Sequence, residues 1–286
     1  MKPAIWSSYL MDLAPEEMVR EFAALGWMEL ELGDEHGAML LARREPVKVG
    51  RTFQAFAAGQ GVSFPQGHLW LMCDIAAVDQ TATLDRLRVW LDLFVAVGVK
   101  AGVLHPGGDE LASKGASPAR ILDAQVKALR VIAAHLRGAG MTICLENVDK
   151  QQAGELRTII DAAGGEGLAI CLDTGHLNVI KGNQGKFIRE SGRLLQALHL
   201  HDNDGSGDQH LLPYGVGNID WADVFAALKE IRYQGLMNFE IPGERRGPLS
   251  VRLAKLDYLR AIWPALWAGQ MLDYEDLRTA ALAASA

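Results

Sequence analysis

Two apolar stretches in the middle of the chain, TICLEN (142–147) and LAICLDT (168–174), decide the fold. Both are apolar without alternation and reach acidic residues at their ends, a pattern typical of parallel strands that are covered on both faces. Between them, KQQAGELRTIIDAAGG (150–165) repeats its apolar residues three and four positions apart and closes with glycine, which predicts an amphipathic helix. This order of strand, helix and strand predicts a parallel sheet with crossover helices.

The same unit repeats toward both ends of the chain. Further strands are predicted at AIWSSYL (4–10), MELEL (28–32), VSFPQ (62–66), AGVLH (101–105), ALHLHD (197–202) and MNFEI (237–241). Helices are predicted at 15–26, 83–98, 118–140 and 220–235, with weaker patterns at 46–60, 186–195 and 252–268. Eight strands, each followed by a helix, predict a closed (β/α)8 TIM barrel of the α/β class. No GxGxxG follows the first strand, which counts against a dinucleotide-binding sheet.

The bulk composition suits one large soluble domain. The chain has 286 residues, of which 49% are hydrophobic, close to the roughly 250 residues of a typical barrel. A net charge of -7 makes nucleic acid an unfavourable partner. Cys73, Cys144 and Cys171 show no paired spacing and are expected to be buried, reduced thiols. Since no secretory signal or membrane-spanning apolar run is recognisable, we expect a cytoplasmic protein without a membrane partner.

Ionisable residues gather at the carboxyl ends of the predicted strands, where barrel enzymes carry their chemistry. Burying many such groups in one cleft is unfavourable unless they are paired or bind cations. Carboxylates and neutral imidazoles are ligands for divalent metals, so the pattern predicts a metal site. The residues at these ends are Glu31, His68, His105, Glu146, Asp173, His176, His199, Asp208, His210 and Glu240.

Purely structural roles are alternatives for several of these residues. Glu146 and Glu240 could be salt-bridge partners, and Asp173 could cap the helix that follows it. His105 could be a hydrogen-bonded loop residue, and His68 a strand-end residue without a ligand role.

The remaining histidines carry weaker signals. His36 and His135 are expected to be surface or helix residues without function. Because His199 and His201 alternate along a strand, at most one of them is expected to face the barrel centre.

Five motifs resemble the xylose isomerase-like barrel superfamily: LEN (145–147), LDTGH (172–176), HLHDND (199–204), DQHLLPYGVGNIDW (208–221) and FEIPGE (239–244). That superfamily includes sugar phosphate isomerases and epimerases, ketose 3-epimerases, inosose dehydratases and endonuclease IV. The resemblance covers nearly the whole chain and implies one barrel domain over residues 1–268. Residues 269–286 are then a C-terminal helical extension, through which a homodimer could form.

The resemblance also implies a ligand set. In the epimerase and isomerase members one divalent metal, Mn2+, Zn2+, Co2+ or Mg2+, is held by residues that match Glu146, Asp173, His199 and Glu240. His199 is preferred over His201 because the family pattern places an acid three residues on, here Asp202. Endonuclease IV holds three zinc ions, and residues compatible with its additional ligands are His68, His105, His176, Asp208 and His210.

The leading hypothesis is isomerisation or epimerisation of a small sugar, sugar phosphate or polyol through an enediolate. The metal would act as a Lewis acid, and Glu146 and Glu240 would exchange the proton. Substrate-binding candidates are His176, His210, His68, His105, Trp6, Trp70 and Glu31, with core packing as the alternative role for the tryptophans. Alternatives are a multinuclear zinc phosphoesterase, an inosose-type dehydratase and a non-catalytic polyol-binding barrel.

Overall fold

The computed structural model describes residues 2–148 and 151–270, which form a closed parallel barrel. Its sheet runs in the order β7-β6-β5-β4-β3-β2-β1-β8. A parallel bridge from Leu200 to Phe239 joins β7 to β8 just past the end of β7 and closes the ring. The strands are β1 (Pro3–Trp6), β2 (Glu29–Leu32), β3 (Ser63–His68), β4 (Ala101–Leu104), β5 (Thr142–Glu146), β6 (Leu168–Asp173), β7 (Leu195–His199) and β8 (Met237–Phe239).

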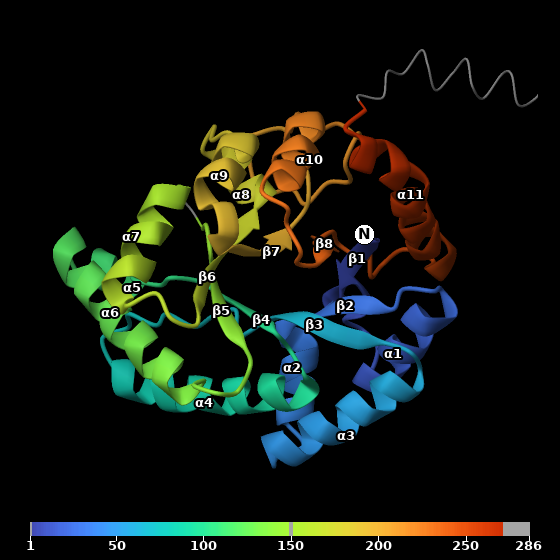
Figure 1. The fold of residues 1–286 in the computed structure, drawn as a ribbon. Coiled ribbons are helices and arrows are strands. Elements are labelled where there is room, and N and C mark those ends of the chain that lie inside the picture. Colours follow the sequence, from blue (N-terminus) through green and yellow to red (C-terminus); the bar gives the residue numbers. More distant parts are fainter. Residues whose placement is uncertain (1, 149–150, 271–286) are drawn as a thin grey trace, which may run out of the picture.

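Helices surround the barrel as an outer layer (Figure 1). They are α1 (Pro15–Ala24), α2 (Asp34–Leu41), α3 (Pro46–Gly59), α4 (Gln80–Val97), α5 (Asp109–Ser113), α6 (Pro118–His135), α7 (Ala153–Ala163), α8 (Thr174–Val179), α9 (Gln184–Ser191), α10 (Trp221–Glu230) and α11 (Leu249–Ala268). Figure 1 shows α11 between α10 and α1, so that the last described helix completes the ring beside the first strand. The (β/α)8 prediction is therefore confirmed.

The first predicted strand, 4–10, is too long. β1 ends at Trp6, and a 3-10 helix follows over Ser7–Leu10. The Ser7 hydroxyl accepts a hydrogen bond from Gly33 N at 2.8 Å and lies 3.0 Å from His36 Nδ1. These side-chain bonds tie the turn to the start of α2, so the chain leaves the sheet early. The predicted helical extension falls almost entirely at residues 271–286, outside the described residues.

The barrel interior contains a layer of small side chains. Val103, Cys144, Ala169, Cys171 and Ala197 pack there as a cluster separate from the main core. All three cysteines of the chain are buried and unpaired, as expected. Burial raises the pKa of the Cys144 thiol to about 12, so this thiol stays protonated at neutral pH.

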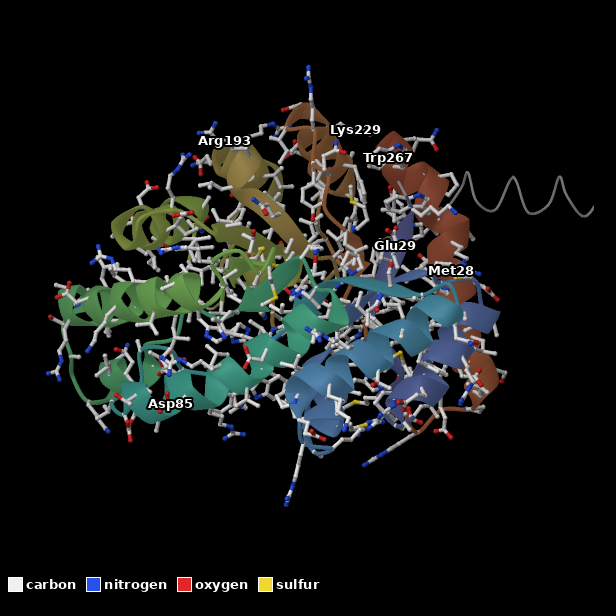
Figure 2. The ribbon with its side chains drawn as sticks, turned by 60° about the horizontal axis from the view of Figure 1, so that its bottom comes forward. Met28, Glu29, Asp85, Arg193, Lys229 and Trp267 are labelled. Atoms are coloured by element: carbon white, nitrogen blue, oxygen red, sulfur yellow. The ribbon has the colours of Figure 1, made fainter. Side chains whose placement is uncertain are left out.

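The two ends of the barrel differ in what they expose. At the amino end, a cavity of about 580 Å³ is lined by residues that begin strands, including Glu29, Ala101 and Leu195. Figure 2 shows Glu29 on this side, with Arg193 and Lys229 on outer segments. The acidic and histidine-rich strand ends lie at the opposite mouth, where this fold places its chemistry. Within the described residues, no helix combines the length and apolar character needed to cross a membrane.

Candidate active site

Four side chains from the second half of the barrel converge at its carboxyl mouth. Glu146, Asp173 and His199 are the last residues of β5, β6 and β7, and Glu240 directly follows β8. One oxygen or nitrogen atom of each lies within 4.8 Å of the corresponding atoms of the other three. All four are buried, Glu240 being the most exposed at 8%. Consecutive parallel strands end at one rim, and this topology brings the four side chains together.

The imidazole of His199 lies at the centre of this cluster. Its Nδ1 is 3.2 Å from Glu146 Oε1 and 3.2 Å from Glu240 Oε2. Burial lowers the pKa of His199, but Cys171 and the surrounding carboxylates together outweigh burial and hold the pKa well above its usual range. For Glu146 the two effects are reversed. Burial raises the pKa of this carboxyl, but His199 and the other imidazoles outweigh burial and hold the pKa well below its usual range.

The charges of these carboxylates fit a bound cation. No Lys or Arg forms an ion pair with Glu146, Asp173 or Glu240 among the residues the structure describes; all their ion-pair partners are histidines. Buried carboxylates without a fixed cation need a proton or a metal to compensate them. Three carboxylates and one imidazole form a donor set that suits Mn2+, Zn2+ or Mg2+.

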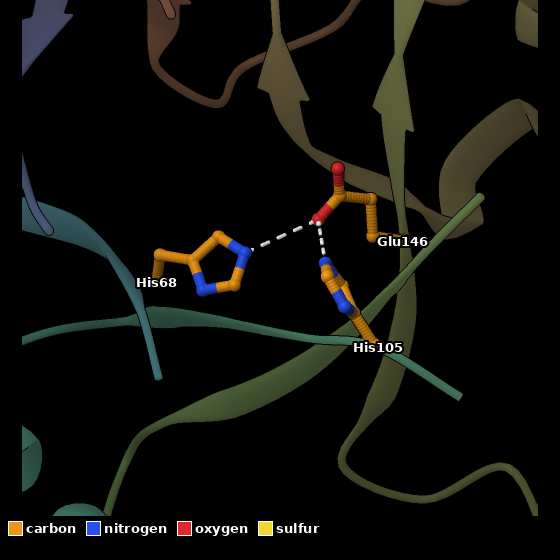
Figure 3. Close-up of side chains that lie close together, drawn as sticks. All are labelled: His68, His105 and Glu146. Atoms are coloured by element: carbon orange, nitrogen blue, oxygen red, sulfur yellow. Dashed lines mark ion pairs between the residues drawn. The ribbon is translucent and has the colours of Figure 1, made fainter. Parts of the chain in front are cut away.

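Glu146 also faces a second pair of imidazoles. His68 Nε2 and His105 Nε2 lie 3.4 and 3.3 Å from Glu146 Oε2 (Figure 3), whereas His199 contacts Oε1. Burial lowers the pKa of His68, but the Glu146 carboxylate outweighs it and raises the value to about 9. The two oxygens of Glu146 thus serve two adjacent groups of ligand-type atoms.

A third group lies in the segment after β7. Asp208 Oδ2 is 3.0 Å from His210 Nε2 and 3.4 Å from His176 Nε2. The ring of His201 stacks on that of His210 at 3.8 Å between centroids. His201, Asp208 and His210 offer ligand atoms close enough together to hold an ion. Burial lowers the pKa of His210, but Asp208 outweighs it and raises the value to about 9.

His201 was not among the predicted site residues. Alternation along a strand placed it opposite His199, but β7 ends at His199 and the alternation ends with it. Of these two histidines, His199 contacts Glu146 and Glu240, whereas His201 Nε2 lies 2.9 Å from both oxygens of Asp173. Asp173 also accepts a hydrogen bond from His176 N at 2.6 Å, so it caps α8 and belongs to the cluster at once.

The glycine of the LDTGH motif makes room for His201. A Cβ built on Gly175 would lie 1.9 Å from Cε1 of the His201 ring, far inside van der Waals contact. The backbone of residue 175 is in an ordinary helical conformation, so space is the reason for glycine here. The packing of His201 against Asp173 therefore requires a residue without a side chain at position 175.

Asn147 is a further residue that the sequence analysis left without a role. Its side chain accepts from Asp173 N at 2.7 Å and donates to Asp173 O at 3.0 Å. This pair of bonds locks the ends of β5 and β6 together beside two of the four clustered side chains. Asn147 is the last residue of the LEN motif, but the sequence alone did not show that its side chain pairs with the backbone of Asp173.

A cavity of about 540 Å³ opens above these groups. Of the predicted site residues it contains His105, His176 and Asp208, and its other walls include Leu71, Met72, Asp74, Asp109 and Gln151. Its volume is within the range of small-molecule pockets. His68 and the four clustered ligand residues are not among its lining residues.

Trp6, Trp70 and Glu31 do not line this cavity, and neither do the four clustered ligand residues, so the substrate-binding role expected of these three stays a prediction. Trp6 is partly buried and donates to Ile241 O at 2.8 Å, and Trp70 packs under the Arg86 guanidinium at 3.9 Å. Glu31 is fully buried in the barrel interior. The Trp6 ring also stacks with that of His210 at 6.5 Å between centroids, and Glu31 contacts His199.

The histidines without a predicted function lie outside the cluster. His135 ends α6 and pairs with Asp92 at 2.9 Å. His36 was expected on the surface or in a helix; it lies in α2 and is fully buried, hydrogen-bonded to Ser7. Burial lowers the pKa of His36, which suits a neutral ring in the core.

Comparison with known proteins agrees with this architecture. The family model of the xylose isomerase-like TIM barrel matches residues 19–262. The chain belongs to this family. A solved structure titled a D-tagatose 3-epimerase-like protein superposes with a TM-score of 0.75 at 22% identity, covering 94% of this chain and 98% of that one. At this identity the superposition shows that the barrel fold is shared.

Curated relatives of this xylose isomerase-like barrel match over shorter stretches. An L-ribulose 3-epimerase of Methylomonas sp. is 29% identical over 162 residues, which cover 52% of each chain. An uncharacterized protein of Sinorhizobium fredii is 26% identical over 167 residues, covering 57% of this chain and 53% of its own. The chain thus spans about half the length of the curated relatives it matches.

Proposed function

We propose that the protein is a divalent-metal-dependent epimerase of a small unphosphorylated sugar, acting on the carbon next to a ketose carbonyl. The observation that carries this proposal is the pair of carboxylates, Glu146 and Glu240, each 3.2 Å from the same nitrogen of His199. The curated relatives that are named as 3-epimerases of L-ribulose and D-psicose support the reaction class.

The chemistry requires one carbon-bound proton to leave and one to return on the other face. A divalent ion held by Glu146, Asp173, His199 and Glu240 would act as a Lewis acid toward the substrate oxygens. One glutamate takes the proton from the carbon, and the resulting enediolate is protonated by the other glutamate, which carries a proton at the start. His105 and His176 line the cavity above and can donate to sugar hydroxyls.

The cavity walls support a substrate without phosphate. Among the described residues, its lining includes Asp74, Asp109 and Asp208 but neither Lys nor Arg. Phosphate sites are usually built from Arg, Lys or helix amino termini, and carboxylates repel a phosphate dianion. A neutral sugar carries no charge for these carboxylates to repel, and its hydroxyls can form hydrogen bonds with the carboxylates and imidazoles of the cavity wall.

Exchange of carbon-bound hydrogen with solvent tests the proposal. Ketopentoses and ketohexoses are incubated in D2O with the metal-free protein plus Mn2+, and NMR follows deuterium entry at carbon 3. We expect exchange with the wild type and none with Glu146→Gln or Glu240→Gln, both of which should remain folded by circular dichroism. Exchange at near wild-type rates in either variant would remove its carboxylate from the mechanism.

A second candidate, metal-dependent phosphoester hydrolysis, is favoured by the two additional groups of ligand-type residues. His68 and His105 with Glu146, and His201 with Asp208 and His210, can each hold an ion besides the central four. Clustered ions would activate water and stabilise the leaving oxygen. Metal analysis separates the two functions, because about one ion per chain supports the epimerase and three zinc ions support the hydrolase.

A further inference from the structure

Glu31 contacts the proposed metal ligand His199 from inside the barrel and does not line the cavity of about 540 Å³ at the mouth. It is the third residue of β2, its side chain faces the barrel interior, and it is fully buried. Its Oε1 lies 3.0 Å from Nε2 of His199, the ring nitrogen that faces away from Glu146 and Glu240. Burying a carboxylate inside a barrel costs free energy unless hydrogen bonds compensate it. The hydrogen-bond partners of Glu31 therefore indicate why a carboxylate is placed here.

Two buried amides hold this carboxylate in place. Gln66 Nε2 donates to Glu31 Oε1 at 3.1 Å, and Asn238 Nδ2 donates to Glu31 Oε2. Gln66 makes a second bond, to Leu198 O at 3.1 Å, which ties it to the strand that carries His199. Four strands, β2, β3, β7 and β8, therefore contribute to fixing one carboxylate against one imidazole.

We infer that Glu31 is the positioning residue for the metal-binding imidazole. By accepting the proton of His199 Nε2, it selects the tautomer in which Nδ1 carries the free lone pair. That lone pair then points toward Glu146 and Glu240, where the cation is proposed to bind. A carboxylate behind a ligating histidine fixes the ring orientation and increases its basicity. This inference rests on the proposed metal site but not on the identity of the sugar.

The test is the affinity of the full-length, metal-free protein for Mn2+, measured calorimetrically without substrate. We expect Glu31→Gln to raise the Kd about 10- to 100-fold, as is typical when the hydrogen-bond partner of a ligand is lost. The control is Asp202→Asn, the same chemical change at a buried carboxylate that binds Trp221 Nε1 and contacts none of the four ligands. Asp202→Asn should keep the wild-type affinity within about twofold.

Equal Mn2+ affinity in Glu31→Gln and wild type would overturn the inference, as would an equal loss in both variants, because that would indicate general loosening of the barrel. If Glu31→Gln does not fold, the test uses Gln66→Met, which removes one of the amides that hold Glu31. This variant should bind Mn2+ several-fold more weakly than the wild type, and an unchanged Mn2+ affinity would contradict the inference. Wild-type Mn2+ binding without sugar exchange would refute the proposed function and leave the role of Glu31 intact.

Discussion

Replacing Gly175 by alanine tests whether the packing around Asp173 is as tight as the structure indicates. The added Cβ would lie 1.9 Å from the His201 ring, so the ring must move by about 1.5 Å to reach ordinary contact at about 3.4 Å. His201 Nε2 lies only 2.9 Å from the Asp173 oxygens, and such a movement takes it out of hydrogen-bond range.

Overpacking of this kind destabilises by about 1–3 kcal/mol. For a protein of this size each kcal/mol lowers the Tm by about 2–4 °C. Because His201 orients a proposed metal ligand, the Kd for Mn2+ should also rise, by about 10-fold. Scanning calorimetry and a Mn2+ titration measure both effects on one preparation.

Gly154 provides a matched control. It is the second residue of its helix, as Gly175 is, and a Cβ built on it meets nothing within 4 Å. Gly154→Ala should leave Mn2+ binding unchanged and raise stability by roughly 0.5–1 kcal/mol, because alanine loses less entropy in a helix. If Gly175→Ala behaves like Gly154→Ala in both assays, the reasoning about His201 is refuted.

Two further predictions concern metal and pH. Removing metal with a chelator should lower the Tm by roughly 5–10 °C relative to protein with Mn2+ at 100 times its Kd, since such binding contributes about 2.7 kcal/mol; an unchanged Tm argues against a metal site. The Arg252 guanidinium beside Asp12, at 2.7 Å, holds the pKa of that carboxyl below its usual range. This pair therefore stabilises the fold above about pH 4 and loses its effect as the pH falls further. Asp12→Asn should lower the free energy of unfolding by about 1 kcal/mol at pH 7, measured by urea unfolding. A difference in stability between wild type and variant that grows as the pH falls would contradict a stabilising Asp12–Arg252 pair.

The barrel was predictable because its strands and long helices carry strong periodic patterns. The short helices α2, α5 and α8 were not expected, since five to eight residues are too few to show a helical repeat. The end of β1 was also misplaced, because the bonds of Ser7 to Gly33 and His36 depend on tertiary contacts.

At the mouth, the chemistry of the strand ends was visible but the partners were not. Glu146, Asp173, His199 and Glu240 could be grouped because consecutive strands end at one rim. The contact of Glu31 with His199 joins residues 168 positions apart and depends on how the closed barrel sets β2 opposite β7. No local pattern in the sequence encodes that relation.

The most direct test of the central claim is a crystal structure of the protein with Mn2+, with the ion located by its anomalous signal. We expect a peak about 2–2.5 Å from oxygens of Glu146, Asp173 and Glu240 and from Nδ1 of His199. An ion elsewhere, or four side chains that share no ion in Mn2+-saturated crystals, would contradict the account.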